Sequence, residues 1–421
     1  MQDARDFLTD LFRAAVDAAD PMSALKGNLP DRPAGRTVVM GAGKGAAQLA
    51  AAFEELWGAP VDGVVVTRYG YACPTRNIRV LEASHPVPDP AGLAAGAEIL
   101  AAVQGLDAED LVIALVCGGG SALLPAPPDG LTLDDEIAVN KALLASGAPI
   151  GEMNTVRKHL SRIKGGRLAA AAAPARVVSL VVSDIPGDNP AFVASGPTVP
   201  DPADRHEALA IVRRYGMELP NAVLAHLESP EAAAPDPRDA VFHRNDVRVI
   251  ASARQSLNAA AEVAKSRGVT PVILSDAIEG EARDIGRMHG ALAREVALHH
   301  TPFKPPVVLL SGGETTVTVR GDGGRGGRNG ELALALAKDI AGLSGVTALS
   351  ADTDGIDGTE DNAGAFADDS TWTRLIDLGA DPSELLAQND SWGAFDRLGD
   401  LFVTGPTGTN VNDFRAILIS D

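Results

Sequence analysis

The sequence predicts an α/β protein of two domains, in which parallel strands alternate with helices. At 421 residues the chain is longer than one ordinary hydrophobic core. Short apolar runs end in glycines or acids and lead into alanine-rich helical segments, which is the alternation expected of a parallel sheet with crossover helices. Hydrophobic residues make up 45% of the chain and aromatic residues only 4%, so the helices are largely built from alanine.

The first domain is expected over residues 1–235. Its first 20 residues read as an amphipathic helix, because acids are spread through them and no uninterrupted apolar core is present. Strands are predicted at 37–40, 63–66, 111–116 and 177–183, each followed by a polar or glycine-containing loop. In parallel sheets, ligands gather at the carboxyl ends of the strands, where these loops lie.

The second domain is expected over residues 236–421, after a segment rich in proline and acids at 228–239. A strand at 247–252, a helix at 254–266 and a strand at 271–275 continue the alternation. Residues 305–321 then place two β-rich runs on either side of SGGE. This sequence pattern predicts a hairpin-like arrangement or a mixed sheet in the second domain.

The charge of the chain narrows the classes of partner. Acidic residues outnumber basic ones by 56 to 36, giving a net charge of −20, and no long basic run offsets it. Nucleic acid and anionic membrane surfaces are therefore poor partners, and an anionic substrate must be met by a few local cations. No stretch approaches the roughly 20 apolar residues of a membrane span. Two cysteines give no disulfide framework, so a reducing cytoplasm is expected.

The turn MGAGKGAAQLA at residues 40–50 is the first candidate site. Backbone N–H groups at a strand-to-helix turn, together with the helix dipole, favour an anion. Glycines at Gly41 and Gly43 fit the dinucleotide fingerprint, but the next strand lacks the acid that binds ribose. Lys44 indicates either an anion at this loop or a solvated lysine at a tight turn.

A second junction of this kind is CGGGSALL at residues 117–124. Gly118, Gly119 and Gly120 remove side chains, so the backbone can approach a ligand closely. Ser121 could cap the following helix, contact phosphate or act as a nucleophile, although the last glycine of a nucleophile elbow is absent. Cys117 is predicted to be a small core residue.

Two further loops lie in the first domain. Six basic residues fall between Arg157 and Arg167, and they could neutralise a phosphate or carboxylate or form a solvated helix that pairs with acids. Asp184 ends an apolar strand and is aimed at the expected ligand face. Asp188 and Asn189 follow in a loop rich in glycine and proline, which is also the composition of an ordinary turn.

The second domain contributes acidic and polar loops. Five acids lie within residues 350–365, but their spacing misses the calcium loop of an EF-hand, and magnesium is the better candidate. An acidic surface turn is the alternative. The loop at 404–414 is polar and follows a short strand. Together with the glycine-rich stretch at 311–337, these loops suggest a cleft between two domains suited to phosphoryl transfer.

Seven motifs then resemble one family in order and context: GAGKGA, CGGGSALL, RKHLSRIKGGRLA, SDIPGDNPAFVASGPTVPD, SGGETTVTVRGDGGRGGRNGELAL, DTDGIDG and GPTGTNVNDF. The chain resembles the class II glycerate kinases (glycerate 2-kinases), formerly named hydroxypyruvate reductases of tartrate degradation, over nearly its whole length. The resemblance implies a Rossmann-like N-terminal domain, a smaller C-terminal α/β domain, and transfer of the ATP γ-phosphate to the 2-hydroxyl of D-glycerate. It implies Mg²⁺ as cofactor, and a homodimer is the candidate assembly.

The family's essential lysine falls on Lys44 and its essential arginine on Arg328. These two cations are expected to face each other across the cleft and to bind the glycerate carboxylate or the transferring phosphoryl group. The backbone of Gly43 and of residues 118–121 is expected to cradle phosphates. The acids expected to bind magnesium or to accept the hydroxyl proton are Asp184, Glu314 and Asp354. The polar loop residues expected near nucleotide or substrate are Asp188, Asn189 and Asn410.

Two other functions are open at this point. One is an NAD(P)H-dependent hydroxypyruvate reductase, favoured by the GAGKGA loop and opposed by the missing ribose acid and by the lysine in that loop. The other is a sensor that binds a sugar acid without catalysis.

Overall fold

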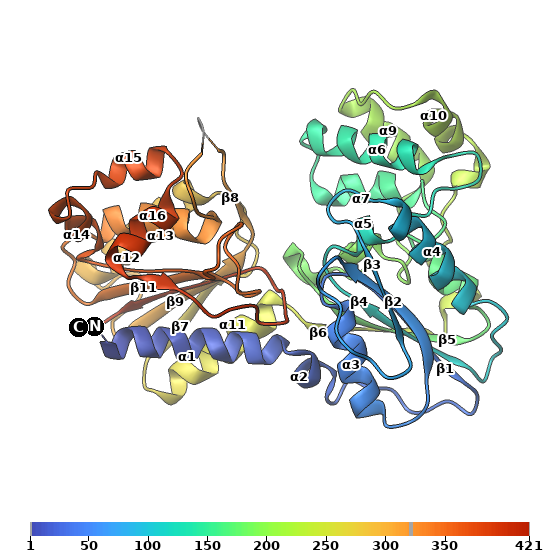
Figure 1. Cartoon of the computed structure of the whole chain (residues 1–421), viewed down its shortest axis with the longest axis horizontal. Coiled ribbons are helices and arrows are strands. Elements are labelled where there is room, and N and C mark those ends of the chain that lie inside the picture. The colour runs from blue at the N-terminus through green and yellow to red at the C-terminus, as the bar shows by residue number, and fades with distance from the viewer. Residues whose placement is uncertain (1, 320–322, 421) are drawn as a thin grey trace. The chain divides into compact units, whose positions relative to one another are not determined.

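The computed structural model describes residues 2–319 and 323–420, so residues 320–322 of the glycine-rich stretch lie outside the described residues. The chain forms two compact units (Figure 1). Unit A extends from Pro21 to Ile250, and unit B combines the chain up to Asp20 with the chain from Ala251 onward. This division differs from the expected boundaries of 1–235 and 236–421 at both ends.

The difference has two physical causes. Helix α1 (Gln2–Ala19) packs Leu8, Leu11 and Phe12 against α11 (Ala253–Ser266) and one face of the second sheet, so the N-terminal helix belongs to unit B. Strand β6 (Asp246–Ala251) lies at the edge of the first sheet and keeps the chain in unit A beyond the proline-rich segment.

Unit A is a six-stranded sheet in the order β3-β2-β1-β4-β5-β6, which is the Rossmann-like order. Strands β1 to β5 pair in parallel, as predicted. Val39, Val65 and Val112 are fully buried, because helices cover both faces of such a sheet and its strands become continuous apolar runs. The first five strands are β1 (Thr37–Ala42), β2 (Asp62–Arg68), β3 (Arg79–Ala83), β4 (Leu111–Val116) and β5 (Arg176–Val182).

The helices of unit A form two groups. Helices α3 and α4 lie with the sheet, whereas α6, α7, α9 and α10 build a separate helical layer around Leu143, Val156 and Ile211 (Figure 1). This layer carries the basic segment of the sequence. The helices of this unit are α2 (Pro21–Leu25), α3 (Ala46–Trp57), α4 (Pro90–Ala102), α5 (Gly120–Leu123), α6 (Leu133–Ser146), α7 (Ile150–Lys158), α8 (Arg167–Ala172), α9 (Arg205–Arg214) and α10 (Asn221–Glu228).

Unit B contains a six-stranded mixed sheet in the order β13-β12-β11-β14-β9-β7. Within this sheet, β7 and β9 pair in parallel, and the other neighbouring strands pair antiparallel. Side chains of β9 alternate between two cores, with Val307 and Leu309 on one face and Val308 and Leu310 on the other. The strands of this sheet are β7 (Thr270–Ser275), β9 (Val307–Gly313), β11 (Val346–Asp352), β12 (Gly364–Asp368), β13 (Leu401–Phe402) and β14 (Asp413–Ile419).

The expected fold class is confirmed, including the mixed second sheet, but the hairpin alternative around SGGE is wrong. Of the run after SGGE, the described part up to residue 319 contains the strand β10 (Thr315–Thr316), which pairs in parallel with β8 (Gly280–Glu281) instead of with β9. The remaining helices of unit B are α12 (Ala282–His299), α13 (Arg328–Ile340), α14 (Thr371–Asp377), α15 (Pro382–Ala387) and α16 (Ser391–Leu398).

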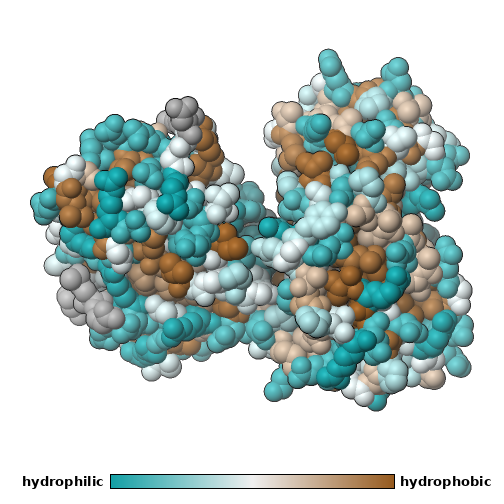
Figure 2. Space-filling model, in the orientation of Figure 1, coloured by the Kyte–Doolittle hydropathy of each residue, from teal (hydrophilic) through white to brown (hydrophobic). Residues whose placement is uncertain are grey.

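Hydrophilic and apolar residues are interspersed over the face shown in Figure 2. Among the described residues, no helix combines the length and apolar character that crossing a bilayer requires.

Candidate active site

The loops after β1 and β4 meet where the strand order of the first sheet reverses, which is the usual ligand position in such sheets. The backbone N–H of Lys44 donates to the carbonyl of Gly118 at 2.9 Å. Gly43 has φ +138°, and a Cβ there would collide with Cys117. Only glycine fits where these loops cross, and the crossing brings Lys44 and the 118–121 loop together.

Two side chains lie against the bare backbone of the second loop. A Cβ on Gly118 would collide with the carboxylate of Asp184, which follows β5. A Cβ on Gly119 would lie 3.3 Å from Cγ of Lys44 and 3.1 Å from Nε2 of His85. The glycines therefore make room for a lysine, a carboxylate and an imidazole at one strand edge.

His85 is a residue that the sequence analysis missed. Burial, together with the positive charges of Lys44 and Arg68, lowers the pKa of His85 to about 4. The imidazole is therefore neutral at pH 7 and offers hydrogen bonds without adding charge. Its position just after β3 could have indicated a site residue. However, β3 is a short edge strand that the sequence pattern did not reveal.

A cavity of about 220 Å³ opens beside this loop. Its polar lining includes His85, Ser121, Asn154, Arg157 and Asp184, and its apolar lining includes residues of α6, α7 and the loop after β5. All of these residues belong to unit A. The cavity thus lies between the glycine-rich loop and the helical layer.

Ser121 takes part in a chain of hydrogen bonds at the cavity wall. Its Oγ lies 2.7 Å from Oγ of Ser195, which donates to Oδ1 of Asn154 at 3.0 Å. Because Ser195 has a single hydroxyl proton, the proton between the two serines comes from Ser121. Helix α5 has Gly119 as its N-cap, so Ser121 does not cap it, and its hydroxyl oxygen is left as an acceptor.

Cys117 agrees with its predicted role as a core residue. Its side chain is buried, and burial raises the pKa of the thiol to about 12. A protonated thiol is a poor nucleophile. Cys117 therefore supports the packing of the loop and not its chemistry.

The basic segment pairs with acids, as one of the two alternatives expected, but its two lysines are buried instead of solvated. Lys158 forms an ion pair with Asp201, and Lys164 Nζ lies 2.7 Å from Oε1 of Glu136. Arg167 donates to four backbone carbonyls, and burial lowers its pKa to about 10. These side chains hold the helical layer together.

Arg157 is different from its neighbours. Its Nε donates to Oδ1 of Asn140 at 2.8 Å and its Nη1 donates to Oδ1 of Asn154 at 3.2 Å. Among residues 2–319 and 323–420, no carboxylate pairs with this guanidinium. Burial lowers the pKa of Arg157, and the negative charge of Glu136 opposes that effect. Arg157 is thus oriented by amides at the cavity wall.

Asp188 and Asn189 do not line the cavity. Asp188 has φ +53° in a short 3-10 turn, and Oδ1 of Asn189 accepts the N–H of Ala191 at 3.1 Å. Both residues thus form the turn after Asp184, and a role in binding stays a prediction.

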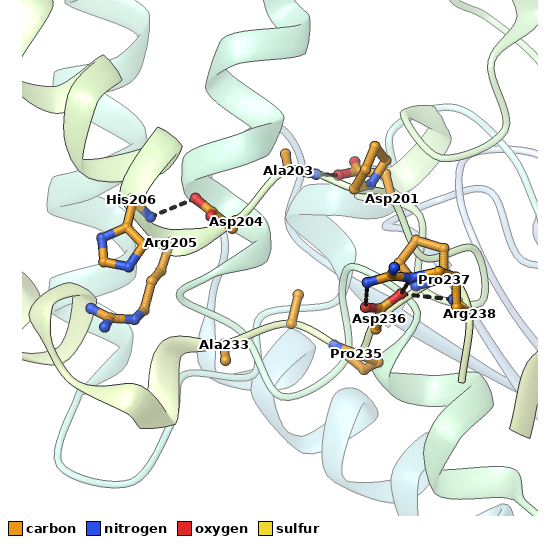
Figure 3. Close-up of a pocket in the computed structure, with 12 residues that line it drawn as sticks. Asp201, Ala203, Asp204, Arg205, His206, Ala233, Pro235, Asp236, Pro237 and Arg238 are labelled. Atoms are coloured by element: carbon orange, nitrogen blue, oxygen red, sulfur yellow. Dashed lines mark hydrogen bonds and ion pairs between the residues drawn. The ribbon is translucent and has the colours of Figure 1, made fainter. Parts of the chain in front are cut away.

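A larger pocket of about 470 Å³ lies elsewhere in unit A, between the start of α9 and residues 233–238 (Figure 3). Several of its charged groups already have partners. Arg238 bonds the Asp236 carboxylate, and Asp204 accepts the backbone N–H of His206. This pocket therefore offers less to a charged ligand than the smaller one does.

In unit B, three carboxylates surround Arg328, the first residue of α13. Its Nε, Nη1 and Nη2 donate to Asp413, Glu314 and Asp352, each at 2.7 Å. Burial lowers the pKa of Arg328, but these carboxylates more than offset burial and raise it above its usual value. Among the described residues, three of its five N–H groups are used, which leaves two for another anion.

Two of these carboxylates, Asp352 and Asp413, are buried, and their pKa values shift in opposite directions. Burial and the nearby Asp354 raise the pKa of Asp352, although Arg328 opposes them. Burial also favours a higher pKa for Asp413, but Arg415 and Arg328 outweigh it and hold that pKa below its usual value. Asp413 is therefore the permanent anion of the cluster.

A fourth acid caps α13. Oδ1 and Oδ2 of Asp357 accept the backbone N–H groups of Asn329 and Gly330 at 2.9 and 2.8 Å. Burial raises the pKa of Asp357 to about 6, while these two bonds oppose the rise. The positive end of the α13 dipole is thus already met by an acid of the chain.

The loops at 352–358 and 404–412 are tied together as one surface. Oγ1 of Thr353 donates to the carbonyl of Asn412 at 2.7 Å, and the N–H of Thr407 donates to the carbonyl of Asp354 at 3.1 Å. Oδ1 of Asn410 accepts the N–H of Asn412 at 3.0 Å. Asn410 therefore shapes this loop, and its contact with nucleotide stays a prediction.

Asp354 is the predicted magnesium ligand. Within the described parts of the chain, no three His, Cys, Asp or Glu side chains are grouped as metal ligands. Oδ1 of Asp354 accepts the N–H of Ile356 at 2.9 Å, so Oδ2 is the oxygen that could bind a cation. Mg²⁺ often takes one or two carboxylates and completes its shell with water and phosphate, so Asp354 and the exposed Glu314 fit that chemistry.

Comparisons with known proteins agree with this two-part organisation. A family model described as a domain of unknown function (DUF4147) matches residues 7–228, and the MOFRL family model matches residues 307–413. A D-glycerate 2-kinase of Thermotoga maritima is 39% identical over 97% of each chain. The chain belongs to the class II glycerate kinase family.

Two further proteins are similar to this member of the glycerate kinase family. The crystal structure of a glycerate kinase from Thermotoga maritima matches with a TM-score of 0.91 and 38% identity, covering all of both chains. A protein of Agrobacterium vitis, provisionally named a hydroxypyruvate reductase, is 51% identical over 99% of this chain and 94% of its own. The fold and family are thereby confirmed.

Proposed function

We propose that this protein is a glycerate 2-kinase, which transfers the γ-phosphate of ATP to the 2-hydroxyl of D-glycerate. The observation that carries the proposal is the crossing of the β1 and β4 loops, where Lys44 and Asp184 lie against bare glycine backbone. Family membership supports the same reaction. Phosphoryl transfer depends mainly on positioning and charge neutralisation, and these residues can supply both.

The roles in the proposal follow from the chemistry of each group. Lys44 neutralises charge on the transferring phosphoryl group, and the backbone of residues 118–121 binds nucleotide phosphates. Asp184 accepts the proton of the 2-hydroxyl as the new oxygen–phosphorus bond forms and the bond to the β-phosphate oxygen breaks. Magnesium, when bound, neutralises charge on the phosphates. Asp354 and Glu314 would hold it.

The carboxylates around Arg328 change the role that its glycine-rich setting in the sequence suggested. Its two remaining N–H groups can bind a phosphoryl oxygen or a carboxylate. The three carboxylates around it make a net negative environment, so an anionic ligand there depends on a cation that offsets them. Joint action of Lys44 and Arg328 on one substrate is part of the proposal.

Hydroxypyruvate reduction is the alternative reaction, supported by the names of the Agrobacterium vitis relatives. Two observations oppose it. Strand β2 ends in Thr67 and Arg68 where an acid would bind the ribose, and the hydroxyl of Thr67 donates to the carbonyl of Lys44 at 3.0 Å. The position used for ribose recognition therefore supports the lysine loop.

One paired assay tests the proposal. Purified protein is incubated with D-glycerate, ATP and Mg²⁺, and ³¹P NMR is expected to show ADP and 2-phosphoglycerate forming together. A parallel reaction contains hydroxypyruvate with NADH or NADPH. Nicotinamide oxidation without ADP formation would overturn the kinase, and tight glycerate binding without turnover would favour the sensor.

The proposal extends to the cell compartment and the assembly. Cys73 and Cys117 are both free thiols, which suits a reducing cytoplasm. A small-molecule substrate, no nucleic-acid partner and a homodimer complete the proposal.

A further inference from the structure

Arg157 is a cation at the cavity wall to which the proposed reaction assigns no role. Lys158 and Lys164 in the same segment each face a carboxylate, and Arg167 is enclosed by backbone carbonyls. Arg157 instead contacts two amide oxygens at the cavity wall. Amides orient a guanidinium without neutralising it, so the charge is available to a ligand.

The surrounding charges strengthen this difference. The carboxylate whose field acts on Arg157 is Glu136, and its Oε1 is already bonded to Nζ of Lys164 at 2.7 Å. A largely buried guanidinium without an anion of its own is costly. A carboxylate bound at Arg157 would offset that cost with two parallel hydrogen bonds, which arginine makes better than lysine does.

The remaining lining and the volume of the cavity indicate which kind of ligand it can hold. Leu144, Ile150 and Phe192 give it apolar walls, and its volume of about 220 Å³ suits a small organic acid. A chain of three hydrogen bonds connects Ser121 to Arg157 through Ser195 and Asn154. A cation therefore lies at one end of that chain and a hydroxyl acceptor beside the glycine loop at the other.

We propose that Arg157 binds the carboxylate of the acceptor acid and that the Ser121 and Asp184 end of the cavity receives its 2-hydroxyl. This rests on the proposed kinase function for the identity of the acid. The carboxylate and the 2-hydroxyl are on adjacent carbons, so anchoring the former at Arg157 sets which hydroxyl reaches the phosphoryl group. Arg157 is then the residue that selects an acid over a neutral polyol.

The test uses three variants of the full chain. Arg157→Gln is expected to raise the KM for D-glycerate about 30-fold, because one charge-assisted pair is lost, while KM for ATP and kcat change less than about threefold. Asn140→Asp is expected to act in the same direction with the arginine retained, because it places a carboxylate against Nε. Arg157→Lys is expected to restore part of the affinity.

Arg162→Gln is the matched control. Arg162 belongs to the same basic segment, is mostly exposed and lies near Asp129, but does not line the cavity. Its removal is expected to leave the KM for D-glycerate unchanged. Equal KM values for Arg157→Gln and Arg162→Gln would overturn the assignment, as would a fall in kcat with KM unchanged.

Binding of D-glycerate without nucleotide separates this inference from the proposed function. Titration calorimetry is expected to show heat with the wild type and about 30-fold weaker binding with Arg157→Gln. Binding that depends on Arg157 without turnover would sink the kinase and keep the acid site. Turnover with unchanged glycerate binding in Arg157→Gln would do the opposite.

Discussion

Lys44 and Arg328 occupy similar sequence settings, a glycine-rich loop that leads into a helix, but their surroundings differ. Lys44 lies beside bare glycine backbone and the neutral His85. Arg328 is bonded to three carboxylates, and a fourth caps the helix that it begins. The first site is prepared for an anion, whereas the second already contains its anions. Glycine spacing therefore predicts close backbone approach but not the sign of the local charge.

Replacing Lys44 with Ala is expected to have the largest effect on activity. Removal of the cation beside the transferring phosphoryl group should lower kcat/KM for D-glycerate about 1,000-fold. The thermal unfolding midpoint should change little, because no buried partner is left without its charge. Coupled ADP release measures the first quantity, and calorimetry the second. A variant with near-normal turnover would remove Lys44 from the catalytic residues.

Arg328→Ala should differ from Lys44→Ala in its effect on stability. It leaves Asp413, Asp352 and Glu314 facing one another, which is expected to lower the free energy of unfolding by about 3 kcal/mol. Adding Glu314→Gln to this variant should recover part of the loss, because it removes one of the repelling charges. Denaturant unfolding measures both changes. Equal stability of wild type and Arg328→Ala would show that the carboxylates do not depend on this arginine.

What the sequence predicts well in this molecule is local. Gly43, Gly118 and Gly119 are needed because two adjacent strands deliver their loops to the same point, and the alternation of strands and helices reveals that adjacency. The apolar run of β4 likewise predicts the burial of Cys117. These features depend on a few consecutive residues and on the order of strands.

What the sequence could not predict is long-range. Asp413 reaches Arg328 from a strand 85 positions along the chain, and this distant contact converts an apparent anion site into an ion-pair cluster. The helix α1 joins unit B through the cores it packs against, which composition near residue 235 does not reveal. Partners separated this far are set by packing, so motif spacing carries no record of them.

Asp357 provides a pH test of the cap on α13. Its pKa is about 6 in the folded chain and about 3.8 when unfolded, so the folded state holds the proton more tightly. Its contribution to stability is therefore present below pH 4 and is lost as the pH rises through 6. From pH 4 to pH 7, wild type should lose about 2 kcal/mol relative to Asp357→Asn, whose side chain does not titrate. Parallel pH profiles in the two proteins would contradict the raised pKa.

Arg325 provides the smallest expected effect and tests the contrast between the two arginines of the glycine-rich loop. Its guanidinium bonds Oε2 of Glu360 and lies 3.5 Å from the ring centre of Trp392, but it is exposed to solvent. Solvent screens such a pair, so Arg325→Ala should leave the unfolding midpoint nearly unchanged and alter kcat/KM less than about threefold. The measurement is made beside Arg328→Ala under identical conditions. A large loss of activity in Arg325→Ala with near-normal activity in Arg328→Ala would mean that the exposed arginine, and not the one enclosed by carboxylates, meets the substrate.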